Sequence, residues 1–385
     1  MSKRILVGTR KGTFIIDRAG SRWKPVLAGH AGAGSNYVAR DPATDTLWAL
    51  LGHGHWGAKL SRSRDGGKSW EDAAQIKYPE GARYIGHVFT DTGDVQQSDK
   101  LKDATLAKLW CIAFGGGRIY VGTIPGGLFV SEDGGDSFEL NRPLWNHESR
   151  GGDLFAGEGN GKTHWFGTPA SEGGEFAPGI HSIVVDPRNR DRVLVAVSTA
   201  GVLETTDGGK SWRGVNKGMT NDYLPDPAAE WGHDAHLIDI CNAQPDHVWQ
   251  QNHSGVFYSS DGAATWRKVS DPSKGVHFGF PVAADDRDGK TAWLVPGRAD
   301  DQRMAIDGGL FVARTRDGGQ SWEQLREGLP QASAYDVVYR HALAASGDQL
   351  AFGSTTGNLY ASDDRGDSWH AIGNNFPPIY SVRFA

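Results

Sequence analysis

Short runs of apolar residues, separated by corners rich in glycine, aspartate and serine, make up most of this chain. Ile5–Gly8, Thr46–Leu51 and Leu109–Phe114 are runs of this kind, and no long amphipathic stretch of the sort that forms a helix is evident. Short apolar runs bounded by turn residues predict β-strands joined by tight turns. The chain is therefore expected to be all-β.

One polar corner occurs six times, and each copy contains a hydroxyl residue, an Asp, a glycine, a second hydroxyl residue and an aromatic residue. The copies span 63–70, 131–138, 205–212, 259–266, 315–322 and 362–369. A pattern that returns at such intervals indicates a repeat architecture. We expect each Asp to hold a turn by accepting hydrogen bonds from the N–H groups one and two residues on, and glycine to supply the positive φ. The two hydroxyl residues should cross-link the strands, the aromatic residue should fill the layer between sheets, and none of these Asp residues is expected to be catalytic.

Four strands can be drawn around each corner, and seven such units can be counted. Their innermost strands are expected at Asn36–Arg40, Leu109–Phe114, Ile180–Asp186, His236–Asn242, Val276–Ala283, Tyr335–Tyr339 and Ile379–Phe384. The last of these completes the first unit, which begins at the amino terminus, so that the two ends of the chain share one sheet and close a ring. We predict one domain over 1–385, a seven-bladed β-propeller, with six or eight blades as the alternatives.

The repeated pattern S/T-x-D-x-G-x-S/T-W resembles the Asp-box, or BNR repeat, of sialidase-like β-propellers. The resemblance covers almost the whole chain and extends to single domains of xyloglucanases and to photosystem II assembly propellers, so it implies the fold more strongly than the function. The Arg-Ile-Pro motif of sialidases is absent, and Arg10, Arg298 and Arg340 could bind a sialic carboxylate by location alone. Sialidase activity is not expected, whereas a glycoside-hydrolase-like activity stays open.

Charge bears on the partners of the protein, and cysteine content bears on its location. The 385 residues carry a net charge of −6, which argues against a nucleic-acid partner. The amino terminus has no apolar run long enough for a signal peptide or a membrane span. Cys111 and Cys241 fall in different units and are expected to be free thiols, which favours a cytoplasmic location.

Unequal connections between the units point to the functional face. Long insertions occupy 75–108, 141–179 and 213–235, and a further loop is expected near 297–307. In a propeller these connections open on one face, opposite the Asp corners. Loops on a rigid scaffold are where binding usually occurs, so a ligand site is expected on this face.

Residues near the start of the innermost strands should surround the mouth of the central channel on this face. When the strands are aligned, this position is occupied by Asn36, Trp110, His181, His236, His277, Tyr335 and Tyr380. Neighbouring corners add Arg10, His53, His55, Trp56, His253 and Arg298. Converging polar and aromatic groups are typical of a ligand site, although histidines can also cap strand ends by hydrogen bonds.

Two kinds of chemistry are open at this mouth. His181, His236 and His277 could bind a divalent metal ion, with Asp234 and Glu230 as carboxylates that orient them or act in catalysis. A glycosidase would instead need two facing carboxyl groups. The insertions supply Glu148, Asp153, Glu158, Asp222 and Asp226, and Trp145, Trp165 and Trp231 could stack on sugar rings.

The expected function is the binding of a small polar ligand, such as a saccharide, with hydrolytic or metal-assisted activity open. The alternative is a non-catalytic scaffold whose long loops bind a protein partner.

Overall fold

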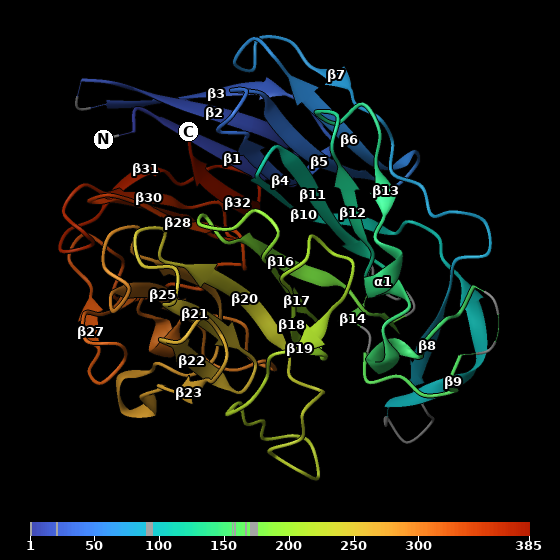
Figure 1. Ribbon diagram of the computed structural model, residues 1–385. Helices are drawn as coiled ribbons and strands as arrows, with labels where there is room; N and C mark the ends of the chain where they lie inside the picture. Colours follow the sequence, from blue (N-terminus) through green and yellow to red (C-terminus); the bar gives the residue numbers. More distant parts are fainter. Residues whose placement is uncertain are drawn as a thin grey trace.

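The computed structural model describes residues 2–20, 22–89, 95–155, 157, 159–165, 168–169 and 176–385. Seven four-stranded antiparallel sheets are arranged as the blades of a propeller, and the described part of the chain contains very little helix (Figure 1). Within each blade the strands run in chain order from the axis outward, apart from the first blade. The predicted all-β, seven-bladed propeller is confirmed.

The first three blades are formed as follows. Blade one contains β1 (Arg4–Thr9), β2 (Gly12–Ala19), β3 (Arg22–Gly29) and β32 (Ile379–Phe384). Blade two contains β4 (Gly34–Arg40), β5 (Leu47–His53), β6 (Gly57–Ser63) and β7 (Glu71–Asp72). Blade three contains β10 (Lys108–Gly115), β11 (Arg118–Ile124), β12 (Leu128–Ser131) and β13 (Glu139–Leu140).

The other four blades follow in order. Blade four contains β16 (Ile180–Val185), β17 (Val193–Val197), β18 (Gly201–Thr205) and β19 (Arg213–Gly214). Blade five contains β20 (Ala235–Ile240), β21 (Val248–Asn252), β22 (Gly255–Ser259) and β23 (Arg267–Lys268). Blade six contains β24 (Gly279–Ala284), β25 (Ala292–Pro296), β26 (Val312–Thr315) and β27 (Glu323–Leu325). Blade seven contains β28 (Leu343–Ser346), β29 (Gln349–Gly353), β30 (Leu359–Ser362) and β31 (His370–Gly373).

The two ends of the chain close the ring as predicted. β32 is the innermost strand of blade one and pairs with β1, with Val7 opposite Val382. The Ser2 hydroxyl also donates to the carbonyl oxygen of Ala385 at 2.8 Å. Joining the first and last strands in one sheet leaves no open blade at the junction.

Each repeated Asp holds its turn through a larger loop than the sequence suggested. Asp65 Oδ1 accepts hydrogen bonds from the backbone N–H groups of Lys68 and Ser69, three and four residues on, rather than one and two. Its Oδ2 accepts the Ser69 hydroxyl at 2.6 Å, and the Ser63 hydroxyl donates to Oδ1 at 2.8 Å. The hydroxyl residues thus connect the two strands as expected. The Trp70 ring donates to the carbonyl oxygen of Ala28 in the neighbouring blade, so it lies between two sheets.

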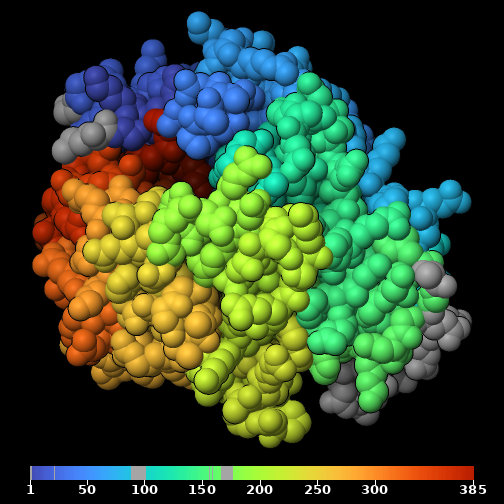
Figure 2. All heavy atoms as spheres, in the orientation of Figure 1, coloured from blue at the N-terminus to red at the C-terminus, as the bar shows by residue number. Residues whose placement is uncertain are grey.

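Two insertions contain structure that the sequence did not predict. β8 (Arg83–Phe89) and β9 (Val95–Asp103) pair with β14 (Thr168–Pro169) and β15 (Phe176–Ala177) in an extra four-stranded sheet. This sheet lies at the rim, near α1 (Arg142–Trp145), at the lower right of Figure 1. The insertion also contains the 3₁₀ helix η1 (Glu148–Arg150). The 3₁₀ helix η2 (Pro272–Lys274) lies in the connection from blade five to blade six, and η3 (Ile306–Gly308) lies between β25 and β26 of blade six. The segment between β19 and β20 projects as the yellow-green lobe at the lower edge of Figure 2.

The innermost strand of blade seven differs from the prediction. It is β28 rather than Tyr335–Tyr339, because Asp336 fixes that earlier segment as a loop. The Asp336 carboxylate accepts hydrogen bonds from Ser354, Thr356 and Asn358 at 2.6–2.7 Å, which anchors it to the corner after β29.

Both cysteines are buried free thiols, as predicted. Among the described residues, no helix is long and apolar enough to cross a membrane.

Candidate functional site

A repeated β-bulge positions the side chains at the mouth of the channel. In blade five, Ala235 pairs with Asn252 and Leu237 with Gln251, so His236 has no partner on β21. The same one-residue irregularity skips Asn36, Trp110, His181 and Tyr380 in the pairing register of their innermost strands. A bulge turns the extra residue out of the ladder and re-aims its side chain. The bulges therefore account for five of the seven residues that the sequence placed at the mouth.

Three of the bulged residues join their blade to the next one by a hydrogen bond. His181 Nδ1 donates to the carbonyl oxygen of Ala235 at 2.8 Å, and His236 Nδ1 donates to that of Gly279 at 2.6 Å. The side-chain amide of Asn36 likewise donates to the carbonyl oxygen of Leu109 at 3.5 Å. Since a carbonyl oxygen only accepts, both imidazoles carry a proton on Nδ1. This structural role was the alternative interpretation of the histidines. It leaves His181 Nε2 without a hydrogen-bond partner among the described residues, whereas His236 Nε2 lies 3.2 Å from Asp234 Oδ2.

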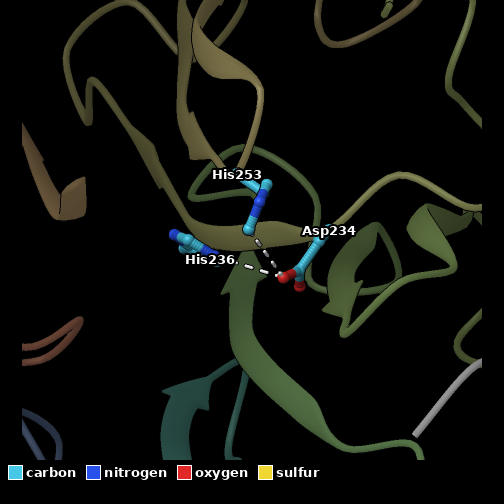
Figure 3. A group of neighbouring side chains, drawn as sticks. All are labelled: Asp234, His236 and His253. Carbon is cyan, nitrogen blue, oxygen red and sulfur yellow. Dashed lines mark hydrogen bonds and ion pairs between the residues drawn. The ribbon is translucent and has the colours of Figure 1, made fainter. Parts of the chain in front are cut away.

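Asp234 lies between two of the imidazoles (Figure 3). Its Oδ2 is 3.2 Å from His236 Nε2 and 3.8 Å from His253 Nδ1. The Asp234 side chain is 12% exposed and His236 is 2% exposed, whereas the His253 side chain is 32% exposed. His236 stacks on Phe280 and meets His253 edge to face. This group, Asp234, His236 and His253, is the acidic and imidazole centre of the site.

Burial and charge set the protonation of this centre. Burial, and then the nearby Arg340 guanidinium, hold the pKa of His181 well below its usual value. Burial also lowers the pKa of His236, although Asp234 opposes this shift. Burial alone would raise the pKa of Asp234, but His236, His181 and Arg340 more than offset it, so that this pKa lies well below its usual range. Asp234 is therefore an ionised carboxylate at neutral pH.

A cationic group adjoins the centre. Lys108 Nζ lies 5.1 Å and Arg340 Cζ 5.3 Å from the centroid of the same Trp110 ring, and Arg340 also lies over Phe280. Trp110 meets His181 edge to face at 4.4 Å, which connects the two groups. Burial, and then Arg340, lower the pKa of Lys108 to about 8, and burial lowers the pKa of Arg340 to about 10. In the described part of the chain, neither side chain forms an ion pair with a carboxylate.

Several predicted residues lie outside both the acidic and imidazole centre and the cationic group. His277 precedes β24, and the bulge of blade six is formed by Phe280 and Pro281 instead. The His277 ring lies beside Gly255, and burial and Lys268 lower its pKa. Tyr335 is 65% exposed because its segment is a loop, and Tyr380, although bulged, is half-buried. The structure thus brings His181 and His236 together, with ring centroids 6.4 Å apart, but not His277.

The predicted corner residues form separate surface features. His53 stacks on Trp56 at 4.7 Å, and the His55 backbone donates to His53. Arg298 is exposed and lies 3.7 Å from Asp307, while Arg10 is exposed and its backbone bonds Pro378. Of the corner residues, His253 alone is shown in contact with Asp234 and His236.

The carboxylates of the insertions do not form a buried pair with Asp234. Glu230, Glu148, Asp153, Asp222 and Asp226 are exposed, and Glu158 lies outside the described residues. Trp145 and Trp165 are buried around the guanidinium of Arg150, so they are not walls for a sugar. Sequence reasoning gave too little weight to Arg340 and missed Lys108 and Phe280. Lys108 adjoins a predicted strand, and Phe280 could have been found by expecting a bulge in every blade.

A cavity of about 390 Å³ lies along the axis next to the site. Its walls include Tyr37, Ser182, Asp239, His341 and Arg383 from five blades. His341 Nε2 donates to the carbonyl oxygen of His181 at 2.7 Å, so His341 connects the cavity to the bulged residues at the channel mouth.

Comparisons with known proteins agree with this architecture. No family model matches the chain. It is 25% identical over 235 residues to the oligoxyloglucan-reducing end-specific xyloglucanase of Emericella nidulans, a match that covers 52% of this chain and 27% of that enzyme. An ancestral GH74 enzyme superposes with a TM-score of 0.58 at 16% identity, covering 92% of this chain and 40% of that one. YCF48 bound to D1 peptide superposes with a TM-score of 0.50 at 14% identity, covering 93% of each chain.

These likenesses define a class. The chain is a seven-bladed propeller that resembles a xyloglucanase over part of its sequence and shares its fold with a GH74 enzyme and with YCF48. The chain spans about a quarter of the length of that enzyme, and the structural likenesses concern the fold alone.

Proposed function

We propose that the protein binds a small saccharide carrying a carboxylate or phosphate group at the bulge level of the channel mouth. The observation that carries this proposal is the placement of Lys108 and Arg340 on one Trp110 ring. Two like charges held near each other in a partly buried place repel, and an anion between them relieves the repulsion. A guanidinium that has no carboxylate within ion-pair distance is also well suited to carboxylate and phosphate groups.

The neighbouring imidazole centre gives the ligand further contacts. His181 packs against Trp110, and its Nε2 has no hydrogen-bond partner among the described residues. Such an atom can accept a hydrogen bond from a sugar hydroxyl. The similarity to a xyloglucanase supports a saccharide over other anionic compounds. Hydrolysis by two facing carboxylates is disfavoured, because Asp234 has no second buried carboxylate beside it in the described residues.

Binding measurements on matched sugars test the proposal. Glucuronate, gluconate and glucose 6-phosphate would be titrated by calorimetry alongside glucose and cellobiose. We expect the acidic sugars to bind at least about tenfold more tightly than the neutral ones, and the difference to shrink with salt. The Arg340→Met and Lys108→Met variants should each lose about tenfold, whereas Arg298→Met, at an exposed arginine near Asp307, should change nothing. Equal affinity for neutral and acidic sugars, or no effect of either variant, would overturn it.

The alternative is a scaffold that binds a protein partner, and the similarity to YCF48 bound to D1 peptide favours it. Such a scaffold should present a broad exposed apolar patch. The exposed large apolar side chains of the described residues instead lie on several blades. They are Val26 and Leu27 on β3, Trp56 in blade two, Tyr223 before blade five, Met304 in blade six and Tyr335 before blade seven. The ligand proposal is therefore the stronger of the two.

A further inference from the structure

Asp234, His236 and His253 bring three donor atoms together. Asp234 Oδ2, His236 Nε2 and His253 Nδ1 all lie within 4.8 Å of one another. Both imidazoles approach the same carboxylate oxygen from different directions (Figure 3). They come from two elements of blade five, since His236 is the bulge of β20 and His253 follows β21. The backbone N–H of His253 also donates to the carbonyl oxygen of Asp234 at 2.9 Å, which fixes the two segments to each other.

The tautomer of His236 makes this arrangement unusual. Because Nδ1 donates to Gly279, Nε2 is the ring nitrogen that faces the Asp234 oxygen, 3.2 Å away, with room between the two atoms for either a proton or a metal ion. A metal ion bound there would take the place of the proton that otherwise joins the imidazole to the carboxylate. Histidines that bind a metal ion commonly donate their other ring nitrogen to a carbonyl or carboxylate, as His236 does here.

Two neighbouring atoms lack partners in the described part of the chain. Asp234 Oδ1 is buried without a hydrogen bond, and so is His181 Nε2. A buried carboxylate oxygen without a donor is costly, because desolvation is then not compensated. The closeness of an uncompensated carboxylate and imidazole lone pairs is the chemistry that a divalent cation satisfies.

We propose that Asp234, His236 and His253 bind one divalent transition-metal ion, with Zn²⁺ as the best match. Two imidazole nitrogens and one carboxylate oxygen are ligands that zinc accepts, at bond lengths of roughly 2.0–2.2 Å. Three protein ligands leave a fourth position for water, which such an ion would activate for hydrolysis. The inference goes beyond the saccharide proposal and stands without it, since Lys108 and Arg340 are not among the ligands.

Metal titration of the whole protein tests this site. Protein stripped with EDTA would be titrated with Zn²⁺ and with Co²⁺, following heat by calorimetry and the visible absorption of bound Co²⁺. We expect one ion per chain and a Co²⁺ spectrum of tetrahedral intensity. Asp234→Asn and His253→Ala should each weaken binding by at least about tenfold. Neither substitution removes the hydrogen bond from His236 to Gly279, so both variants are expected to fold.

His277→Ala and His55→Ala are the matched controls, because these histidines lie outside the centre and should leave the affinity unchanged. Absence of binding to the wild type, or equal affinity in the wild type, Asp234→Asn and His253→Ala, would overturn the metal site. Loss of affinity in the His55→Ala control would instead assign the ion to the surface histidines and would also contradict the proposal.

Discussion

His236 donates from Nδ1 to the carbonyl oxygen of Gly279, 2.6 Å away on the innermost strand of the next blade. The same imidazole stacks on Phe280, the residue after that carbonyl. One side chain therefore has two functions, because it joins blades five and six and also turns Nε2 toward Asp234. The structural role and the ligand role of this histidine do not exclude each other.

Removal of the His236 imidazole should lower the free energy of unfolding more than its replacement by asparagine. His236→Ala leaves the buried Gly279 carbonyl unpaired and opens a cavity beside Phe280, so we expect a loss of about 3 kcal/mol in the free energy of unfolding. His236→Asn retains a side-chain amide at a position where Asn36 contacts the next blade, and should lose about 1 kcal/mol less. Urea unfolding in EDTA measures both without a contribution from bound metal. Equal losses would mean that the hydrogen bond to Gly279 contributes nothing.

Two adjacent glycines of one Asp corner should respond differently to the same substitution. A Cβ on Gly135 would lie 2.2 Å from the Trp48 ring, whereas a Cβ on Gly134 would meet nothing within 4 Å. Both have positive φ, so Gly134→Ala should cost about 1 kcal/mol and Gly135→Ala about 2 kcal/mol more. Thermal unfolding of the two variants checks the difference. If both lose the same stability, backbone strain rather than contact with Trp48 determines the requirement for glycine.

The blades could be predicted from sequence because their corners are local chemistry. Asp65 and its hydroxyl partners lie within a few residues of one another, so the pattern that forms the turn is visible in the chain. The innermost strand of blade seven could not be placed this way. Tyr335–Tyr339 has the composition of a strand, but hydrogen bonds to Asp336 from the corner after β29 hold it as a loop.

The candidate site was predictable in part for a similar reason. His181 and His236 were identified because they occupy equivalent positions in adjacent blades, but a bulge is a change of register between two strands and leaves no mark on composition. His277 was chosen where Phe280 occupies the bulge. The role of Lys108 and Arg340 depends on two blades that meet at the Trp110 ring, which no local pattern reveals.

Two arginines of an ion-pair network in blade four should contribute unequally to the free energy of unfolding. Arg192 contacts Asp186 at 2.8 Å and Glu204 at 2.7 Å, and the side chains of these two acids are 3% and 4% exposed. Arg192→Met removes a partner from two buried carboxylates, so a loss of about 3 kcal/mol is expected. Arg188 contacts Asp186 as well, but its side chain is 48% exposed, and Arg188→Met should cost less than about 1 kcal/mol. Urea unfolding at neutral pH compares the two, and a larger loss for Arg188→Met would contradict this assignment.

Acid should weaken the protein through its Asp corners. The hydroxyl and N–H of Ser69 hold the pKa of Asp65 well below its usual 3.8, and Ser137 and Ser211 do the same for Asp133 and Asp207. A carboxyl whose pKa is lower in the folded state contributes its stability above the unfolded pKa, and this contribution is lost as the pH falls below about 4.

The variant that combines Asp65→Asn, Asp133→Asn and Asp207→Asn tests this dependence. It should be less stable than the wild type at pH 7, because asparagine is a weaker acceptor for the same donors. Its urea midpoint should fall less steeply between pH 4 and pH 2.5, since unfolding of the variant takes up fewer protons, up to about one fewer for each replaced carboxyl as the pH approaches 2.5. Parallel pH profiles for the two proteins would show that acid acts on other carboxylates. The same variant should bind acidic sugars and Zn²⁺ as the wild type does at pH 7, because the three Asp residues hold turns and belong to neither the cationic group nor the imidazole centre.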